Sequence, residues 1–241
     1  MVRLILLSFL VITTSASCVF VGGKRVKGNG NISTSERNVS EFDQVEVHGA
    51  IDVYVSQGAL RPVRIEGDEN LLSYIEVEQR NNKIEVSTKK GYNLRPSRKM
   101  KIYVSSPNYN KLEVSGACNI NTENKLTLNN PLNLEVSGAG DINADVNAPR
   151  IEAEVSGSGN VNMKGETKNF ELKISGAGDA KCYDLLTETT KVNISGAGSA
   201  QVFASVELDA HVSGAGSIKY KGNAPKVNQQ VSGAGSVKKA D

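Results

Sequence analysis

Glutamates at regular intervals are the first residues of this chain that could do chemistry. Glu113, Glu135 and Glu154 are 22 and 19 residues apart, and on stacked strands they would lie about 4.8 Å from one another. A retaining glycosidase places its two carboxyl groups about 5 Å apart. The sequence around these glutamates shows no apolar environment that would tune one of them as an acid, so we expect a solvated ladder and no catalytic residues.

Metal-binding residues are sparse. Gly-Ala-Gly-Asp at 138–141 and 176–179 is similar to the calcium-binding nonapeptide repeat, but only two of seven related segments carry the aspartate. Their spacing of about 19 residues is also twice that of the calcium repeat. His48 and His211 are isolated in the sequence, which predicts no zinc site and no catalytic base. We therefore expect no metal and no cofactor.

The beginning of the chain predicts export. Arg3 precedes an apolar run from Leu4 to Ile12, and small residues then lead into Cys18, which is typical of a signal peptide over residues 1–17. The small residues before Cys18 resemble the lipobox of bacterial lipoproteins, although Ser15 stands where leucine is usual. We expect Cys18 to carry a lipid that anchors the protein to the outer membrane. Cleavage near Ser17 with release, giving a periplasmic or secreted protein, is the alternative.

Charge excludes one class of partner. Without residues 1–17, the chain has 27 basic and 26 acidic residues, and so lacks the concentrated positive charge that a nucleic-acid-binding protein needs. Basic residues do gather between Lys89 and Lys101. We expect a solvated loop there; contact with an anionic sugar or a lipid headgroup is the alternative.

Internal repetition dominates the second half of the chain. Ser-Gly-Ala-Gly or a close variant occurs seven times, beginning at Ser115, Ser137, Ser156, Ser175, Ser195, Ser213 and Ser232. A period near 19 residues with strand-like content is typical of one coil of a solenoid. The sequence therefore predicts an all-β protein, a right-handed parallel β-helix with coils of about 19 residues.

Alternation within the repeat predicts which side chains face inward. The residues one and three before the motif serine, and five after it, are mostly apolar, whereas the residue two before it is mostly polar. Because side chains alternate across a strand, we expect both motif glycines to point inward. Cys118 replaces the second glycine of the first motif, and Cys182 lies three coils away, too far for a disulfide; both thiols should be free.

The remaining segments are less regular. Residues 18–40 are rich in Gly, Asn, Ser and Lys and predict a flexible tether. Residues 41–110 predict an irregular β-rich part that continues or caps the solenoid, and residues 111–241 the regular solenoid. Segments 45–52, 84–87 and 102–105 repeat the start of the motif.

Ligand contacts are expected on the outward side chains. A row of motif serines could meet a glycan, a surface protein or a second copy of the chain, or could serve only to form the turns. Tyr54 and Tyr103 could stack on sugar rings or simply cover their sheet. The row in question comprises Ser137, Ser156, Ser175, Ser195 and Ser213.

The lipobox-like start, the strand pair from Phe42 to Val55 and the serial Val-Ser-Gly-Ala-Gly motifs resemble the putative auto-transporter adhesin, head GIN domain family, over residues 38–238. The resemblance implies an exported β-solenoid of the Gram-negative cell envelope that acts as an adhesin or scaffold and is not an enzyme. A carbohydrate-active β-helix enzyme or a polysaccharide-binding protein is the alternative function.

Overall fold

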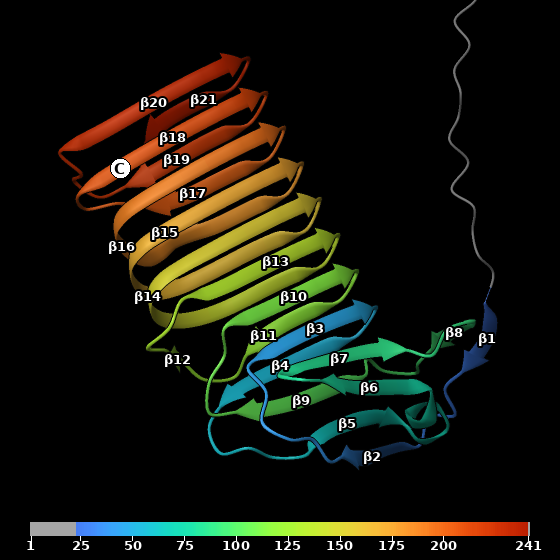
Figure 1. Cartoon of the computed structure of the whole chain (residues 1–241). Helices are drawn as coiled ribbons and strands as arrows, with labels where there is room; N and C mark the ends of the chain where they lie inside the picture. Colours follow the sequence, from blue (N-terminus) through green and yellow to red (C-terminus); the bar gives the residue numbers. More distant parts are fainter. Residues whose placement is uncertain (1–22, 241) are drawn as a thin grey trace, which may run out of the picture.

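The computed structural model describes residues 23–240. The predicted signal peptide and Cys18 lie outside these residues. The chain forms a stack of parallel coils with an N-terminal set of antiparallel strands at its base (Figure 1), and the predicted β-solenoid is confirmed. None of the described helices is long and apolar enough to span a membrane.

The N-terminal part contains nine strands and one short 3-10 helix. These elements are β1 (Lys24–Lys27), β2 (Ile32–Arg37), β3 (Gln44–Gly49), β4 (Asp52–Gln57), β5 (Val63–Asp68), η1 (Glu69–Tyr74), β6 (Ile75–Arg80), β7 (Lys83–Thr88), β8 (Tyr92–Arg95) and β9 (Lys101–Ser106).

The regular coils contain the remaining twelve strands. These are β10 (Lys111–Gly116), β11 (Asn119–Thr122), β12 (Leu126–Thr127), β13 (Leu132–Gly138), β14 (Asp141–Gly157), β15 (Asn160–Gly176), β16 (Asp179–Gly196), β17 (Ser199–Phe203), β18 (Glu207–Gly214), β19 (Ser217–Lys221), β20 (Lys226–Gly233) and β21 (Ser236–Lys239).

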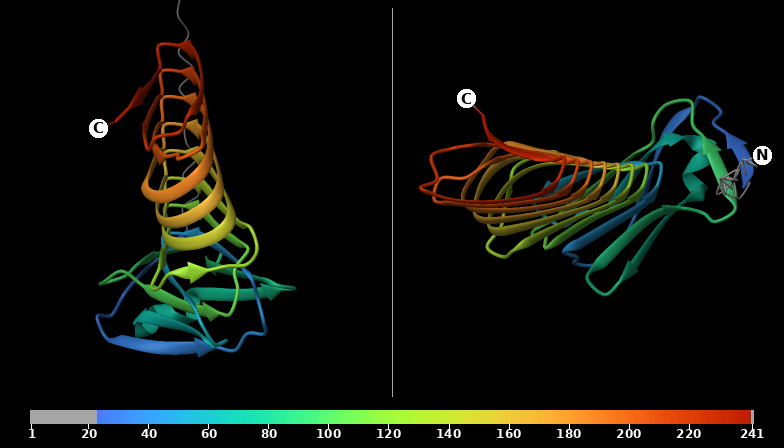
Figure 2. Two further views of the ribbon diagram at one scale, coloured as in Figure 1. Left: turned by 90° about the vertical axis from the view of Figure 1, so that its left-hand side faces the viewer. Right: turned by 90° about the horizontal axis from the view of Figure 1, so that it is seen from above.

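Two walls make up each flattened coil (Figure 2). The first wall contains β3, β10, β13, the second halves of β14, β15 and β16, and then β18 and β20. After the motif turn the chain returns along the second wall, through β4, β11, the first halves of β14 to β16, β17, β19 and β21. Motif residues of successive coils pair in register, so each motif position forms a column along the stack.

The core lies between the walls and includes the predicted apolar columns. The β-branched residue before the motif serine is at most 2% exposed in the first six motifs, from Val114 to Val212. The seventh motif differs, because β20 and β21 each pair with one neighbour only. Val231 is accordingly 43% exposed.

Coils at the base do not stack in sequence order. β3 and β4 form a coil that lies directly below β10 and β11, while β7 and β9, which come later in the chain, lie below β3 and β4. β6, β5 and β2 then add antiparallel strands at this end. The N-terminal half therefore both continues the solenoid and caps it.

One boundary needs correction. Residues 18–40 were expected to be a flexible tether, but β2 pairs with β5 along its whole length and β1 pairs with β8. Backbone hydrogen bonds to strands far along the chain order residues 24–37, which composition alone did not reveal. The flexible tether therefore stays a prediction only for the residues that precede β1.

Candidate interaction surface

The motif serines form a straight row on the outside of the first wall. Parallel pairing aligns each serine with that of the next coil. The buried residue before each serine points inward, so the serine points to solvent. We define the serine row as Ser137, Ser156, Ser175, Ser195 and Ser213, all of which are exposed.

Towards the C-terminal end, the serine row borders a shallow depression of about 570 Å³. Its polar lining comes from two neighbouring columns of the first wall. One column supplies hydroxyls and the other supplies Glu154, Lys173, Asn193, His211 and Gln230. Asp209 fixes the ring of His211 through a 2.8 Å contact to Nε2, and Gln230 lies 3.1 Å from Nδ1. The depression thus combines these hydrogen-bonding groups with apolar lining from Ile174, Ile194 and Val212.

The turn that follows each motif serine contains the two motif glycines, and the first of these does not point in the direction that the sequence predicted. Gly176 has a φ of +126° and is partly exposed, whereas Gly178 is buried. The prediction that the second glycine points inward is confirmed. The same prediction for the first glycine was wrong, because its positive φ breaks the alternation of side chains at the bend.

A second column secures the same turns. Asn160 Nδ2 donates to Asp141 Oδ1 at 2.8 Å, the Asp179 amide donates to Asn160 Oδ1 at 3.1 Å, and Ser199 Oγ donates to Asp179 Oδ1 at 2.5 Å. The two aspartates that resemble calcium ligands therefore accept hydrogen bonds from neighbouring coils. Their role in the structure is to connect coils.

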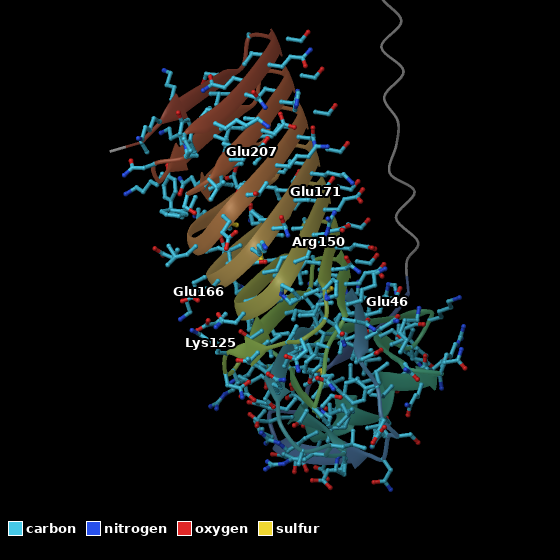
Figure 3. The ribbon with its side chains drawn as sticks, turned by 60° about the vertical axis from the view of Figure 1, so that its left-hand side comes forward. Glu46, Lys125, Arg150, Glu166, Glu171 and Glu207 are labelled. Carbon is cyan, nitrogen blue, oxygen red and sulfur yellow. The ribbon has the colours of Figure 1, made fainter. Side chains whose placement is uncertain are left out.

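The predicted glutamate ladder is present and longer than expected. Parallel register places five glutamates in one column of the first wall: Glu85, Glu46, Glu113, Glu135 and Glu154. Lys111 bridges two of them, with Nζ 2.9 Å from Glu113 and 2.8 Å from Glu135. Figure 3 shows Glu46 on the same side of the stack as Arg150, Glu171 and Glu207. Charge pairing of this kind favours a structural ladder over an acid–base pair, since a general acid needs a raised pKa.

The two candidate tyrosines do not join the serine row. Tyr54 on β4 and Tyr103 on β9 belong to the second wall, where their rings stack with centroids 5.2 Å apart. The Arg64 guanidinium lies 4.0 Å above the Tyr103 ring. Residues 102–105 thus align with residues 53–56 of the second wall and not with a motif start, which corrects the sequence alignment. These contacts favour the interpretation that the tyrosines cover their sheet.

Sequence reasoning missed a concentration of positive charge at the base. β1 pairs with β8 in parallel, although the two strands are more than 60 residues apart. We call this region the basic ribbon. Its exposed basic residues are Lys24, Arg25, Lys27, Lys89, Lys90, Arg95, Arg98 and Lys99. The sequence showed the basic residues that begin at Lys89. It did not show that the basic residues of β1 lie beside them, because β1 falls within the predicted tether.

Comparisons with known proteins agree with this architecture. A putative adhesin from Bacteroides fragilis is 25% identical, with a TM-score of 0.82, over 89% of this chain and 100% of its own. A putative adhesin from Parabacteroides merdae is 26% identical, with a TM-score of 0.72, over 90% and 100% of the two chains. A protein described as a putative lipid binding protein, from Parabacteroides distasonis, is 24% identical over the same shares, with a TM-score of 0.75, and shows the fold alone.

No functionally curated protein matches the chain. The family model for the putative auto-transporter adhesin, head GIN domain, matches residues 41–224. This match covers β3 to β9, including the coils that do not stack in sequence order, and six of the seven motifs. The resemblance inferred from the motifs is confirmed: the chain belongs to the putative auto-transporter adhesin, head GIN domain family.

Proposed function

We propose that this protein is a non-enzymatic interaction module of the cell envelope that binds glycan chains through the serine row. The observation that carries the proposal is the exposed row of hydroxyls, which is continuous over successive coils and borders the depression. The adhesin names of the family and of its structural neighbours support the same function.

The chemistry of the surface favours a polyhydroxylated partner. Hydroxyl, amide and imidazole groups can donate and accept hydrogen bonds. They recur with the spacing of the coils, about 4.8 Å, so an extended polymer could make the same contact repeatedly. Glycans on surface proteins and envelope polysaccharides both have this character.

A glycan array and a pull-down with matrix glycoproteins, both using residues 19–241, test the proposal. Ser195→Trp should abolish binding, because Ser195 lies in the depression and the indole would obstruct it. Gln201→Trp is the matched control, since Gln201 is an outward residue of the same coil on the second wall. Equal binding by the two variants would exclude the serine row as the contact.

Placement in the envelope forms the second part of the proposal. The basic ribbon begins six residues after Cys18, and anionic lipid surfaces attract clustered Lys and Arg by about 1 kcal/mol per residue. A lipid on Cys18 would hold the ribbon against such a surface. Only Lys99 of the ribbon pairs with an acidic group among residues 23–240, at 3.1 Å from Asp52.

Metabolic labelling with a fatty-acid analogue tests the anchor. The wild-type protein should take up the label and sediment with membranes, whereas Cys18→Ser should be unlabelled and soluble in the periplasm or the medium. Label retained by Cys18→Ser would refute lipidation at this residue.

The competing function is a carbohydrate-active enzyme that uses the glutamate column. Incubation with the polysaccharides that bind would release new reducing ends or unsaturated sugars in that case, and Glu113→Gln would stop the release. We expect no product from either protein, because Lys111 bridges Glu113 and Glu135.

A further inference from the structure

Three side chains at the base of the first wall converge on one point. β3 and β7 pair in parallel with Glu46 opposite Glu85, and His48 follows Glu46 by two residues on the same face. Nε2 of His48 lies 2.8 Å from Oε1 of Glu46 and 3.7 Å from Oε1 of Glu85. The sequence made His48 look isolated because its second neighbour, Glu85, is 37 residues away.

Such a set of donors matches the requirements of a transition-metal ion. Zn²⁺ binds imidazole nitrogen and carboxylate oxygen at about 2.0–2.2 Å. Tetrahedral bonds of this length separate the donor atoms by about 3.4 Å. The three donor atoms here all lie within 4.8 Å of one another, so small side-chain movements would bring them onto one ion. The imidazole argues against Ca²⁺ and Mg²⁺, which prefer oxygen ligands.

Neighbouring groups hold the cluster in place. Lys83 Nζ forms an ion pair with Oε2 of Glu46, which leaves Oε1 directed at His48. Carboxylate ligands of metals are commonly fixed by an outer hydrogen bond of this type. The carboxylate of Glu46 is therefore oriented towards His48 before any ion arrives.

We propose that Glu46, His48 and Glu85 form a binding site for one divalent transition-metal ion of the Zn²⁺ type, with the remaining positions open to water. The exposed fractions of the three side chains are 14%, 35% and 27% respectively, so an ion could enter without unfolding. On binding, the ion replaces the hydrogen bond between His48 and Glu46.

A second histidine, His211, provides a control for the proposed metal site. His211 lies on the same wall and also contacts a carboxylate, Asp209, at 2.8 Å. Its other ring nitrogen faces the amide of Gln230, not a second carboxylate. Among residues 23–240, the cluster around His48 is the one group of at least three ligand-type side chains with donor atoms this close.

Calorimetric titration of Zn²⁺ and absorption spectroscopy with Co²⁺ test the site on the Cys18→Ser mature chain. We expect one ion per chain and Co²⁺ bands without thiolate charge transfer, because Cys118 and Cys182 are buried. His48→Ser and Glu85→Gln should each weaken binding by at least about tenfold. Serine occupies the position of His48 in the seven motifs, so the substitution fits the fold, and Glu85→Gln keeps the side-chain shape.

The variant His211→Ala should bind as the parent chain does. Unchanged thermal midpoints without metal would verify that all variants fold. The proposal is overturned if the parent chain binds no Zn²⁺ at millimolar concentration, if His48→Ser and Glu85→Gln bind as well as the parent, or if His211→Ala alone removes binding.

Discussion

The first and second glycines of the motif are required for partly different physical reasons. In the fourth motif, Gly176 has a φ of +126°, and a Cβ there would lie 2.4 Å from the carbonyl oxygen of Gly157 in the adjacent coil. Gly178 faces inward, and its Cβ would lie 2.3 Å from the oxygen of Gly159 and 2.6 Å from Cγ1 of Val155. Both glycines thus allow the backbones of adjacent coils to approach; the first also provides the positive φ of the bend, and the second also leaves room for the core valine.

Substitution of adjacent residues separates these effects from surface tolerance. Gly176→Val should lower the free energy of unfolding by about 1–3 kcal/mol or more, because the residue needs a positive φ and contacts the next coil. Ala177→Val should change it by less than about 0.5 kcal/mol, since Ala177 is exposed. Chemical denaturation of the two variants measures the difference, and a greater loss for Ala177→Val would mean that inside and outside are reversed.

Buried thiols provide a second prediction for individual residues. Cys118 and Cys182 are both free and buried, as expected from their positions in the coils. Burial raises the pKa of Cys118 and raises the pKa of Cys182 to about 12, so little thiolate exists at neutral pH.

Alkylation of the native chain at pH 8 should therefore leave both thiols unmodified, whereas unfolding in denaturant should expose both to iodoacetamide. Mass spectrometry counts the adducts. Rapid modification of the native protein would contradict the burial, and a crosslink between residues 118 and 182 would contradict the coil register.

Among the elements, the basic ribbon depends on one buried carboxylate. Asp68, at the end of β5, is fully buried and accepts hydrogen bonds from the Gly30 amide at 2.7 Å and from the amide and hydroxyl of Ser97 at 2.8 and 2.7 Å. Gly30 follows β1 and Ser97 follows β8. Although burial acts in the opposite direction, the hydrogen bonds lower the pKa of Asp68.

Replacement of this carboxylate should loosen the ribbon in a pH-dependent way. Because the folded pKa lies below the unfolded value of about 3.9, Asp68 stabilises the fold fully above that pH and loses its contribution as the pH falls through the folded pKa. Asp68→Asn should lower the thermal midpoint at pH 7 and increase amide exchange in β1.

The deficit of Asp68→Asn in thermal midpoint should shrink as the pH is lowered below 4. Asp184→Asn, at an exposed position, should match the wild type throughout. A deficit that is the same at pH 3 and pH 7 would show that the charge of Asp68 is not what fixes the ribbon.

Considered as a whole molecule, the solenoid could be predicted from the sequence where structure is local and periodic. The apolar columns that include Val155, Leu172 and Ile142 occupy the core as their spacing indicated. The spatial order of the base could not be predicted in this way. Long-range strand pairing puts β7 and β9 below β3 and β4, and short segments such as 84–87 do not specify which wall they join.

The candidate sites, too, could be predicted where they depend on local periodicity and not where they depend on long-range strand pairing. Alternation placed the serine row outside, because each serine follows a buried residue of the same strand. The cluster of Glu46, His48 and Glu85 and the basic ribbon depend on pairs of strands that are distant in the chain. Alignment of residues 84–87 with 45–48 was the signal that could have revealed the first. For the ribbon, the sequence showed only the run of basic residues from Lys89 to Lys101, because β1 carries no copy of the motif.

The central claim is that the motif serines form one continuous, solvent-facing row in strict coil register. Engineered cysteine pairs test it most directly, because a disulfide requires Cα atoms about 4.4–6.8 Å apart. Ser175 and Ser195 are register partners on adjacent coils, whereas Ser175 and Ser213 are two coils apart. Mild oxidation should crosslink Ser175→Cys with Ser195→Cys within one chain, and should leave Ser175→Cys with Ser213→Cys reduced and fully open to alkylation. Crosslinking of the second pair but not the first, or thiols protected from alkylation in both, would contradict the account.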